Sequence, residues 1–388
     1  MKIGIAGPVS LRLLSTYVEY GEQMPAGYLF APMAAWVESL LMRDHQISIF
    51  TLAPGISTPL TFTGKQLTIH IGRYRAHHRA HDFFKQEQED LLKAIQKDPV
   101  DILHANWTYE FALAGLKSGL PTLITAHDAP LNILKIYPDP YRFARLLMAR
   151  QVCQKAQIMT AVSRYIENHF RQVFRFKAPI FVIPNGVPDF IFNLAKPNKA
   201  HSQQKNTVFA SNLTGWVGRK NGKTLILAFS LLRKQYPECI LWMFGAGHGE
   251  NEAAHIWAKK MGIAENIVFR GQTPYQQLLE EMAEHVDALV HPAIEESFSM
   301  AIAEAMAMGI PVIGGRESGA VPETIGQSGI LVDIKNPHDL ANAMAQLVQD
   351  RSLRNNLAKL GFEKAKNCYK LDKVTQQYEN IYKLILSA

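Results

Sequence analysis

Short apolar runs alternate with longer amphipathic stretches along nearly all of the 388 residues. The apolar runs have the length of buried strands, and they fall into two series. The first series comprises residues 2–6, 46–51, 101–104, 122–125, 158–161 and 180–183, and the second comprises 207–210, 239–244, 266–270, 288–291, 311–313 and 329–332. This order restricts the chain to folds in which each strand is followed by a crossover segment.

The crossover segments have helical character. Helices are predicted over 31–43, 83–96, 111–117, 142–155, 223–235 and 251–260, and a last helix over about 370–385. Strands that alternate with helices indicate parallel sheets covered by helices, which is the doubly wound α/β class. Two such series in tandem predict two Rossmann-like domains facing across a cleft, with ligands at the carboxyl ends of the strands.

A polar segment separates the two series. Residues 193–206 contain no β-branched residue and read as an interdomain linker. The predicted domains are therefore residues 1–195 and 196–369, followed by the last helix. The chain length fits two domains of ordinary size better than one.

The composition is that of a globular cytoplasmic protein, with 47% hydrophobic and 19% charged residues. The longest apolar stretch, 28–42, carries Glu38 and is too short and interrupted for a membrane span. Residues 1–8 read as a first strand and lack the layout of a signal peptide. The three cysteines lie far apart without metal spacing, so we expect free thiols in a reducing compartment.

The net charge of +7 favours anionic partners such as a nucleotide sugar or a phospholipid surface. Part of the excess lies in the basic run, residues 70–81. This run reads either as a solvated face or as a patch that contacts an anionic membrane or a phosphate-bearing acceptor. His77 and His81 are spaced for metal chelation on a helix, but no third ligand is evident, and no metal site is predicted.

The segment from Met300 to Met308 is apolar on every face except at Glu304. A helix with this pattern is buried, and a buried carboxylate without a partner is costly. Glu304 therefore needs a hydrogen-bond donor, either within the core or on a ligand hydroxyl. The helix start near Ser299 offers free backbone N–H groups to an anion, and Glu296 lies just ahead of it.

The order of residues here resembles a known signature. Glu296 and Glu304 are separated by seven residues, with Ser-Phe after the first and Ala-Met-Ala-x-Gly-x-Pro-Val after the second. This arrangement is similar to that of the retaining GT-B glycosyltransferases of family 4, and the similarity extends over nearly the whole chain. It implies an acceptor-binding first domain, a nucleotide-sugar-binding second domain, and a C-terminal helix (about 370–388) that packs back on the first domain.

The resemblance assigns roles around the signature. Phe298, Ser299 and Met300 match the loop whose backbone amides hold the donor diphosphate, although the family usually has Gly in place of Ser299. Glu304 matches the acid that binds the nucleotide ribose. Glu296 matches the acid that contacts hydroxyls of the transferred sugar.

Other loops of the second domain resemble parts of the same site. Lys220 matches a lysine that reaches the diphosphate, and Arg219 either replaces the family's second cation or that cation is absent. Two leaving phosphates need fixed positive charge. The turn with Gly245 and Gly247 follows a strand and is read as lining the donor cleft, and Arg270 lies in the segment beside the nucleobase. Residues 318–323 are interpreted either as structural support of the site or as a direct contact.

In the first half, His127 and Asp128 end a strand and resemble a segment whose histidine lies near the reacting sugar. A histidine at a strand end can also be purely structural. Gly27 lies in a loop similar to the family's Gly-Gly loop near the phosphates, with one of the two glycines kept. Residues 101–106 and 183–187 are treated as scaffold.

The predicted function is a retaining, metal-independent hexosyl transfer from a nucleotide-diphosphate sugar, with UDP- or GDP-sugar as co-substrate and no other cofactor. The catalytic assignments are His127, Glu296 and Lys220. The acceptor is expected to be a glycan or a lipid-linked molecule, with peripheral contact with the inner membrane face allowed and nucleic acid not expected. A nucleotide-sugar 2-epimerase and a non-catalytic protein that binds anionic surfaces remain alternatives.

Overall fold

The computed structural model describes residues 1–28, 31–195, 206–216 and 218–387, and it divides into two compact units. Unit 1 is Met1–Gly186 with Leu371–Ala388, and unit 2 is Val187–Lys370. The first boundary thus precedes the predicted one at 195/196. The reason is that Val187 donates a backbone hydrogen bond to Tyr369 and Ile191 is fully buried. Most of the predicted linker, residues 196–205, lies outside the described residues.

Unit 1 is built on an eight-stranded sheet with the order β3-β4-β2-β1-β5-β6-β7-β8. All pairs are parallel except β3 with β4. The strands are β1 (Lys2–Ala6), β2 (Gln46–Ala53), β3 (Leu60–Thr63), β4 (Leu67–Arg73), β5 (Ile102–Asn106), β6 (Thr122–Ala126), β7 (Met159–Ala161) and β8 (Ile180–Val182). The predicted series contained six of these strands and missed β3 and β4.

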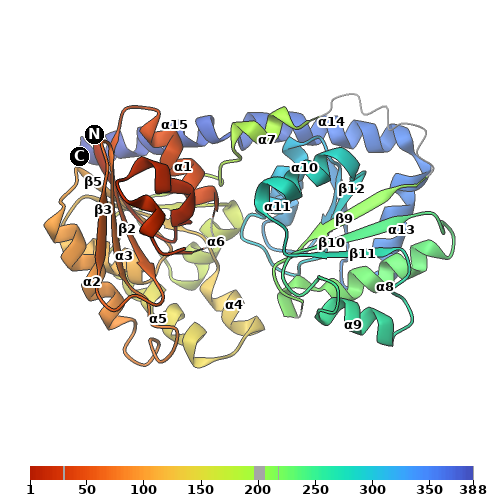
Figure 1. Ribbon diagram of the computed structural model, residues 1–388, viewed down its shortest axis with the longest axis horizontal. Helices are drawn as coiled ribbons and strands as arrows, with labels where there is room; N and C mark the ends of the chain where they lie inside the picture. The colour runs from red at the N-terminus through yellow and green to blue at the C-terminus, as the bar shows by residue number, and fades with distance from the viewer. Residues whose placement is uncertain (29–30, 196–205, 217, 388) are drawn as a thin grey trace. The chain divides into compact units, whose positions relative to one another are not determined.

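Helices cover both faces of this sheet (Figure 1). One face carries α1 (Ala31–Leu41) and α15 (Leu371–Leu386), which pack on each other, and the other carries α2 (Lys85–Lys97), α3 (Glu110–Ser118) and α5 (Pro140–Lys155). The remaining elements are η1 (Leu11–Tyr17), η2 (Gly21–Gln23), α4 (Pro130–Ile136) and α6 (Arg164–Val173). Helix α15 is held by ion pairs of Arg43 with Asp372 and Glu379.

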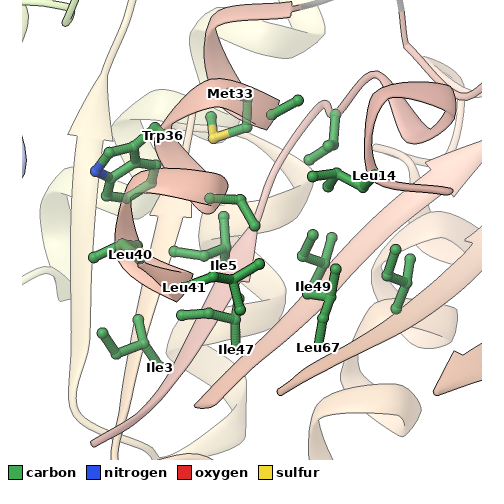
Figure 2. Packing of buried hydrophobic residues seen from close by; sticks show 14 of the residues in the cluster. Ile3, Ile5, Leu14, Met33, Trp36, Leu40, Leu41, Ile47, Ile49 and Leu67 are labelled. Atoms are coloured by element: carbon green, nitrogen blue, oxygen red, sulfur yellow. The ribbon is translucent and has the colours of Figure 1, made fainter. Parts of the chain in front are cut away.

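The core of unit 1 forms where α1 packs on the first strands. Figure 2 shows Trp36, Leu40 and Leu41 of α1 facing Ile3 and Ile5 of β1, with Ile47, Ile49 and Leu67 from the neighbouring strands. All of these side chains are buried. Both faces of the inner strands are covered, which is why the strands read as continuous apolar runs in the sequence.

Unit 2 is built on a parallel six-stranded sheet with the order β11-β10-β9-β12-β13-β14. The strands are β9 (Val208–Asn212), β10 (Ile240–Phe244), β11 (Ile267–Gly271), β12 (Ala288–His291), β13 (Val312–Gly315) and β14 (Gly329–Val332). The helical elements are α7 (Asp189–Asn193), η3 (Gly218–Lys220), α8 (Gly222–Arg233), α9 (Ala253–Lys260), α10 (Tyr275–His285), α11 (Met300–Ala307), α12 (Val321–Ile325), α13 (Pro337–Gln349) and α14 (Arg351–Cys368). Helices α8 and α13 pack together, as do α11 and α14.

The strand order reverses at one point in each sheet, between β1 and β5 in unit 1 and between β9 and β12 in unit 2. In doubly wound sheets ligands bind beyond the carboxyl ends of the strands at such a switch point. The loops after β9 and β12 contain Lys220 and Glu296, and the segments after β5 and β6 contain Trp107 and His127. The fold therefore places the predicted residues Lys220, Glu296 and His127 beyond the carboxyl ends of strands next to the switch points.

No helix among the described residues has the length and apolar character needed to cross a bilayer.

Candidate functional site

Two ion pairs join the loops that flank the switch point of unit 2. Lys220 Nζ lies 2.6 Å from Glu296 Oε1, and an Arg219 Nη lies 3.0 Å from Glu295 Oε2 and 3.9 Å from Glu296 Oε2. The four side chains are at most 24% exposed. The structure thus brings together the predicted residues Arg219, Lys220 and Glu296 and adds Glu295. The two cations and two carboxylates together carry no net formal charge.

The carboxylate of Glu296 is strongly stabilised in its ionised form. Burial by itself would raise its pKa, but the hydrogen bond with His291 and the charges of Lys220 and Arg219 hold the pKa well below the ordinary value. The backbone of Glu296 is also fixed, because its carbonyl accepts a 2.8 Å bond from Ala320 N–H in the loop after β13. Residues 318–320 therefore support the Glu296 backbone, which agrees with the structural interpretation of that segment.

Ser299 has φ of +74°, in the left-handed region that favours glycine. This explains why a glycine is expected at this position. The Ser299 hydroxyl does not cap α11, contrary to what a serine before a helix suggests, and instead lies 3.3 Å from His291 Nε2. The N–H groups at the start of α11 are therefore not occupied by this side chain.

Glu304 lies inside α11 and is 5% exposed. Its Oε1 accepts a 2.6 Å hydrogen bond from the Tyr275 hydroxyl, at the first residue of α10. Burial raises the pKa of Glu304 to about 7, and the hydrogen bond from Tyr275 opposes that rise. The buried acid is therefore paired with a neutral phenol and not with the cation that an ordinary core would supply.

The turn after β10 is packed tightly against its neighbours. Gly245 has φ of +101°, and a Cβ at this position would lie 1.9 Å from the Leu213 carbonyl oxygen, so only glycine fits. Its N–H donates to the Gly271 carbonyl at 2.7 Å. Gly247 also has positive φ. The turn is thus held between the loops after β9 and β11.

Three other predicted donor residues have different environments. Arg270 stacks on Trp242 with its guanidinium carbon 4.7 Å from the ring and pairs with Glu281, so no contact joins it to the Lys220 pair among the described residues. Phe298 is buried against Tyr369, and its carbonyl accepts a 2.6 Å hydrogen bond from the Thr324 hydroxyl, so its side chain is not available to a ligand. Met300 is the first residue of α11 and is partly exposed.

In unit 1, His127 Nε2 lies 2.9 Å from Asn106 Oδ1. Burial lowers the pKa of His127 to about 4, so the ring is neutral at physiological pH. Because an amide oxygen only accepts, Nε2 carries the hydrogen and Nδ1 has the lone pair. His127 and Asn106 line a pocket together with Trp36, Asn185, Gly186 and Tyr378.

Asp128 is held beside this pair. Its Oδ1 accepts a 2.7 Å bond from the Tyr109 hydroxyl, and its Oδ2 lies 3.4 Å from Arg145, whose guanidinium carbon is 3.7 Å from the Tyr109 ring centroid. Gly27 has φ of +67° and forms an isolated bridge with Ser10. Gly27 is thus tied to the loop after β1 and contacts neither His127 nor Asp128 through any described hydrogen bond.

The basic run is not helical at His77 and His81, so the helical spacing of these histidines is not realised. Its arginines are engaged within unit 1: Arg73 pairs with Asp90, Arg75 with Asp82 and the fully buried Glu87, and Arg79 lies 4.0 Å from the Tyr74 ring and donates to Tyr141. The histidines at 77, 78 and 81 are exposed. No group of three or more His, Cys, Asp or Glu side chains within the described part of the chain is arranged to hold a metal ion.

Four residues of these sites were missed from the sequence. Glu295 directly precedes Glu296, and His291 ends the predicted strand 288–291, which was an available signal. Asn106 also ends a strand, but it was treated as scaffold. Tyr275 gave no signal, because its contact with Glu304 spans 29 positions and depends on how α10 and α11 are placed.

Comparisons with known proteins identify the family and the fold. The profile of the family described as Glycosyl transferases group 1 matches residues 193–364, and that of Glycosyltransferase Family 4 matches residues 33–189. N-acetyl-alpha-D-glucosaminyl L-malate synthase of Bacillus anthracis is 21% identical over 304 residues, which cover 75% of this chain and 77% of that protein.

Two solved structures resemble the whole chain. A sucrose-phosphate synthase from Thermosynechococcus elongatus has a TM-score of 0.78 at 18% identity, covering 100% of this chain and 99% of that one. An Anabaena protein in complex with UDP-glucose has a TM-score of 0.70 at 16% identity, covering 99% of each chain. At these identities the likeness concerns the fold.

Proposed function

The chain is a glycosyltransferase of the group 1, family 4 type with the GT-B fold, and we propose that it transfers a hexose from a UDP- or GDP-sugar, with retention of anomeric configuration, to a glycan or lipid-linked acceptor. The proposal assigns the donor to unit 2 and the acceptor to unit 1. The observation that carries the donor assignment is the cluster of Lys220 and Arg219 with Glu296 beside the start of α11.

The proposed roles in unit 2 follow from charge. A departing nucleoside diphosphate develops negative charge, and fixed N–H donors stabilise it where they are already oriented. Lys220, Arg219 and the backbone at Ser299 and Met300 would supply these donors, with the helix dipole of α11 acting in the same direction. This arrangement would allow transfer without a metal ion.

The two acids would bind the rest of the donor. Glu296 is held ionised and would accept hydrogen bonds from hydroxyls of the transferred sugar. Glu304 would accept from the nucleotide ribose. The neighbour in complex with UDP-glucose supports a uridine donor for this chain.

His127 would take part in the transfer on the acceptor side, within unit 1. Its neutral ring and fixed orientation suit hydrogen bonding to a sugar hydroxyl and do not require a charged imidazolium. We assign no enzymatic nucleophile, since in the proposed mechanism the leaving phosphate assists removal of the acceptor proton on the same face of the sugar.

The three arginines of the basic run already have partners within unit 1. Their support for a peripheral membrane contact is therefore weaker than the sequence alone indicates. Co-sedimentation with phosphatidylglycerol vesicles at low and high salt tests this contact. Binding that is lost at high salt would support it, and no binding at low salt would remove it from the proposal.

The alternatives make different predictions. A nucleotide-sugar 2-epimerase would turn over the donor without an acceptor, and a non-catalytic anion binder would be insensitive to Glu296→Gln. The family profiles and relatives favour the transferase over both.

Thermal-shift titration of UDP-, GDP- and ADP-sugars against wild type, Lys220→Ala and Glu304→Ala tests the proposal. Lys259→Ala, on α9, is a matched control. We expect one donor to stabilise wild type and the control but neither site variant. Equal stabilisation of all four proteins would place the ligand elsewhere, and no stabilisation of wild type by any donor would reject the donor class.

A further inference from the structure

We propose that Tyr275 is a positioning residue that orients the carboxylate of Glu304 toward a ribose hydroxyl and makes binding of the nucleotide dependent on that hydroxyl. The proposal rests on the proposed function in two respects, that unit 2 binds a nucleoside diphosphate and that Glu304 accepts from its ribose. It adds a residue that neither the sequence pattern nor the family resemblance identified.

The geometry fixes one of the two carboxylate oxygens. The Tyr275 hydroxyl donates to Oε1 of Glu304 at 2.6 Å, which is at the short end for a neutral donor and a carboxylate. Tyr275 is the one side chain among the described residues that hydrogen-bonds the Glu304 carboxyl group. Because Tyr275 begins α10 directly after Pro274, its backbone is anchored at a helix start, and the ring is largely buried.

The hydrogen-bonding capacity of the Glu304 carboxylate determines which ligand group it can bind. An ionised carboxylate only accepts hydrogen bonds, and it has room for several donors. With Oε1 bound by Tyr275, Oε2 is left to accept from a ligand group that carries a hydrogen. A ribose hydroxyl meets that need, and a deoxy carbon in its place does not. A ligand that lacks the hydroxyl binds much more weakly where it would leave a buried polar group of the protein unpaired.

Tyr275 also favours the ionised state that this role needs. Burial raises the pKa of Glu304 to about 7, and the Tyr275 hydrogen bond works against the rise. Without that bond, a larger share of Glu304 would be protonated near neutral pH. A protonated carboxyl group is a weaker acceptor, so ribose recognition would decline and would return at higher pH.

The titratable groups on the elements around α11 act on other partners. His291 on β12 lies near Glu296 and Ser299, Lys364 on α14 donates to the Glu323 carbonyl on α12, and Lys370 pairs with Asp189 on α7. None of them is among the causes of the Glu304 shift. A pH effect on ribose recognition that depends on Tyr275 therefore reports on the Tyr275–Glu304 pair.

The experiment measures calorimetric dissociation constants for UDP, GDP and ADP and for their 2′-deoxy and 3′-deoxy forms at pH 6, 7.5 and 9. The proteins are wild type, Tyr275→Phe, Glu304→Gln and the control Tyr236→Phe, which removes a hydroxyl that bonds Gln349 elsewhere in unit 2. The readout is the ratio of the constants for a deoxy form and its parent. Ionisation of the phosphates affects both nucleotides equally and cancels in this ratio.

We expect a ratio of about 10 to 100 in wild type for one of the two deoxy forms. In Tyr275→Phe the ratio falls at least fivefold at pH 7.5 and recovers only in part at pH 9, where Glu304 is ionised but no longer held by the Tyr275 hydroxyl. Glu304→Gln gives a low ratio at every pH, and Tyr236→Phe behaves as wild type.

Two results would overturn the inference while leaving the donor proposal intact. One is that Tyr275→Phe has the same ratio of dissociation constants as wild type at all three pH values. The other is that Tyr275→Phe binds every nucleotide more weakly by the same factor, with no recovery at higher pH. Failure of wild type to bind any of the three parent nucleotides would instead reject the donor site itself.

Discussion

Lys220 Nζ lies 2.6 Å from Glu296 Oε1, and this pair joins the loops on either side of the switch point of the unit 2 sheet. The pair stabilises the fold of unit 2, because each partner is at most 17% exposed and the loss of Glu296 would leave the ammonium group of Lys220 without its carboxylate.

Glu296→Gln is expected to lower the stability of unit 2 by about 3 kcal/mol and the transfer rate by about 100-fold or more. The pKa of Glu296 is lowered on folding, so its stabilising contribution is present above the ordinary carboxyl pKa and is lost as the pH falls below it. Chemical denaturation at pH 7 and an activity assay check both effects. The exchange Lys220→Glu with Glu296→Lys should recover stability but not activity, and recovery of activity would contradict the assigned roles.

Glu304→Gln is expected to stabilise the protein at pH 8 by up to about 3 kcal/mol and to weaken donor binding. The pKa of Glu304 is raised to about 7, so wild type loses stability as the pH rises from the ordinary carboxyl pKa toward 7, and the amide does not. Thermal denaturation at pH 5 and pH 8 measures this difference. A stabilisation that is equal at both pH values would show that ionisation of Glu304 is not its cause.

Ser299→Gly should raise the melting temperature, since a serine at φ of +74° carries strain of about 1 kcal/mol that glycine does not. Its hydroxyl contact with His291, at 3.3 Å, is too long to offset that strain. Ser299→Ala is the matched control: it removes the hydroxyl and keeps the Cβ, so it should not be more stable than wild type. Equal stabilisation by both variants would exclude backbone strain as the reason.

His127 should remain neutral across the working pH range, because burial lowers its pKa to about 4. The ratio of the wild-type rate to that of His127→Ala should therefore be constant from about pH 5.5 to 8.5. Asn106→Ala, which removes the partner of Nε2, should reduce the rate as well. A change in the ratio near pH 6.5 would mean that His127 titrates during catalysis.

Arg75→Ala is expected to destabilise unit 1 by about 3 kcal/mol, since it leaves the fully buried carboxylate of Glu87 without its cation. His78→Ala, at an exposed position in the same basic run, should change stability by less than about 0.5 kcal/mol. Denaturant titration compares the two variants. If Arg75→Ala is also neutral, the run is a surface patch after all.

The fold class was predictable because each inner strand is buried on both faces and therefore reads as an apolar run. Every strand of the two predicted series is present, whereas β3 and β4 were missed. Strand β3 is antiparallel at the sheet edge with alternating partial exposure, so its apolar pattern is weak. Strand β4 ends in the basic run, where Arg73 and Arg75 pair with acids of α2, and sequence spacing does not reveal those pairs.

The candidate site was likewise predictable from the sequence only in part. Glu296, Glu304 and Lys220 could be named from the sequence because their order and spacing along the chain carry the signal. The partners of the site residues could not be named from the sequence. Tyr275 contacts Glu304, and Asn106 contacts His127, because separate crossover connections bring these side chains together in the folded protein. The sequence by itself determined the alternation of strands and helices and the residues that carry charge. Tertiary structure decided which of those charges are neutralised, held ionised or left protonated, because burial and partner distance set these properties and neither is encoded in local spacing.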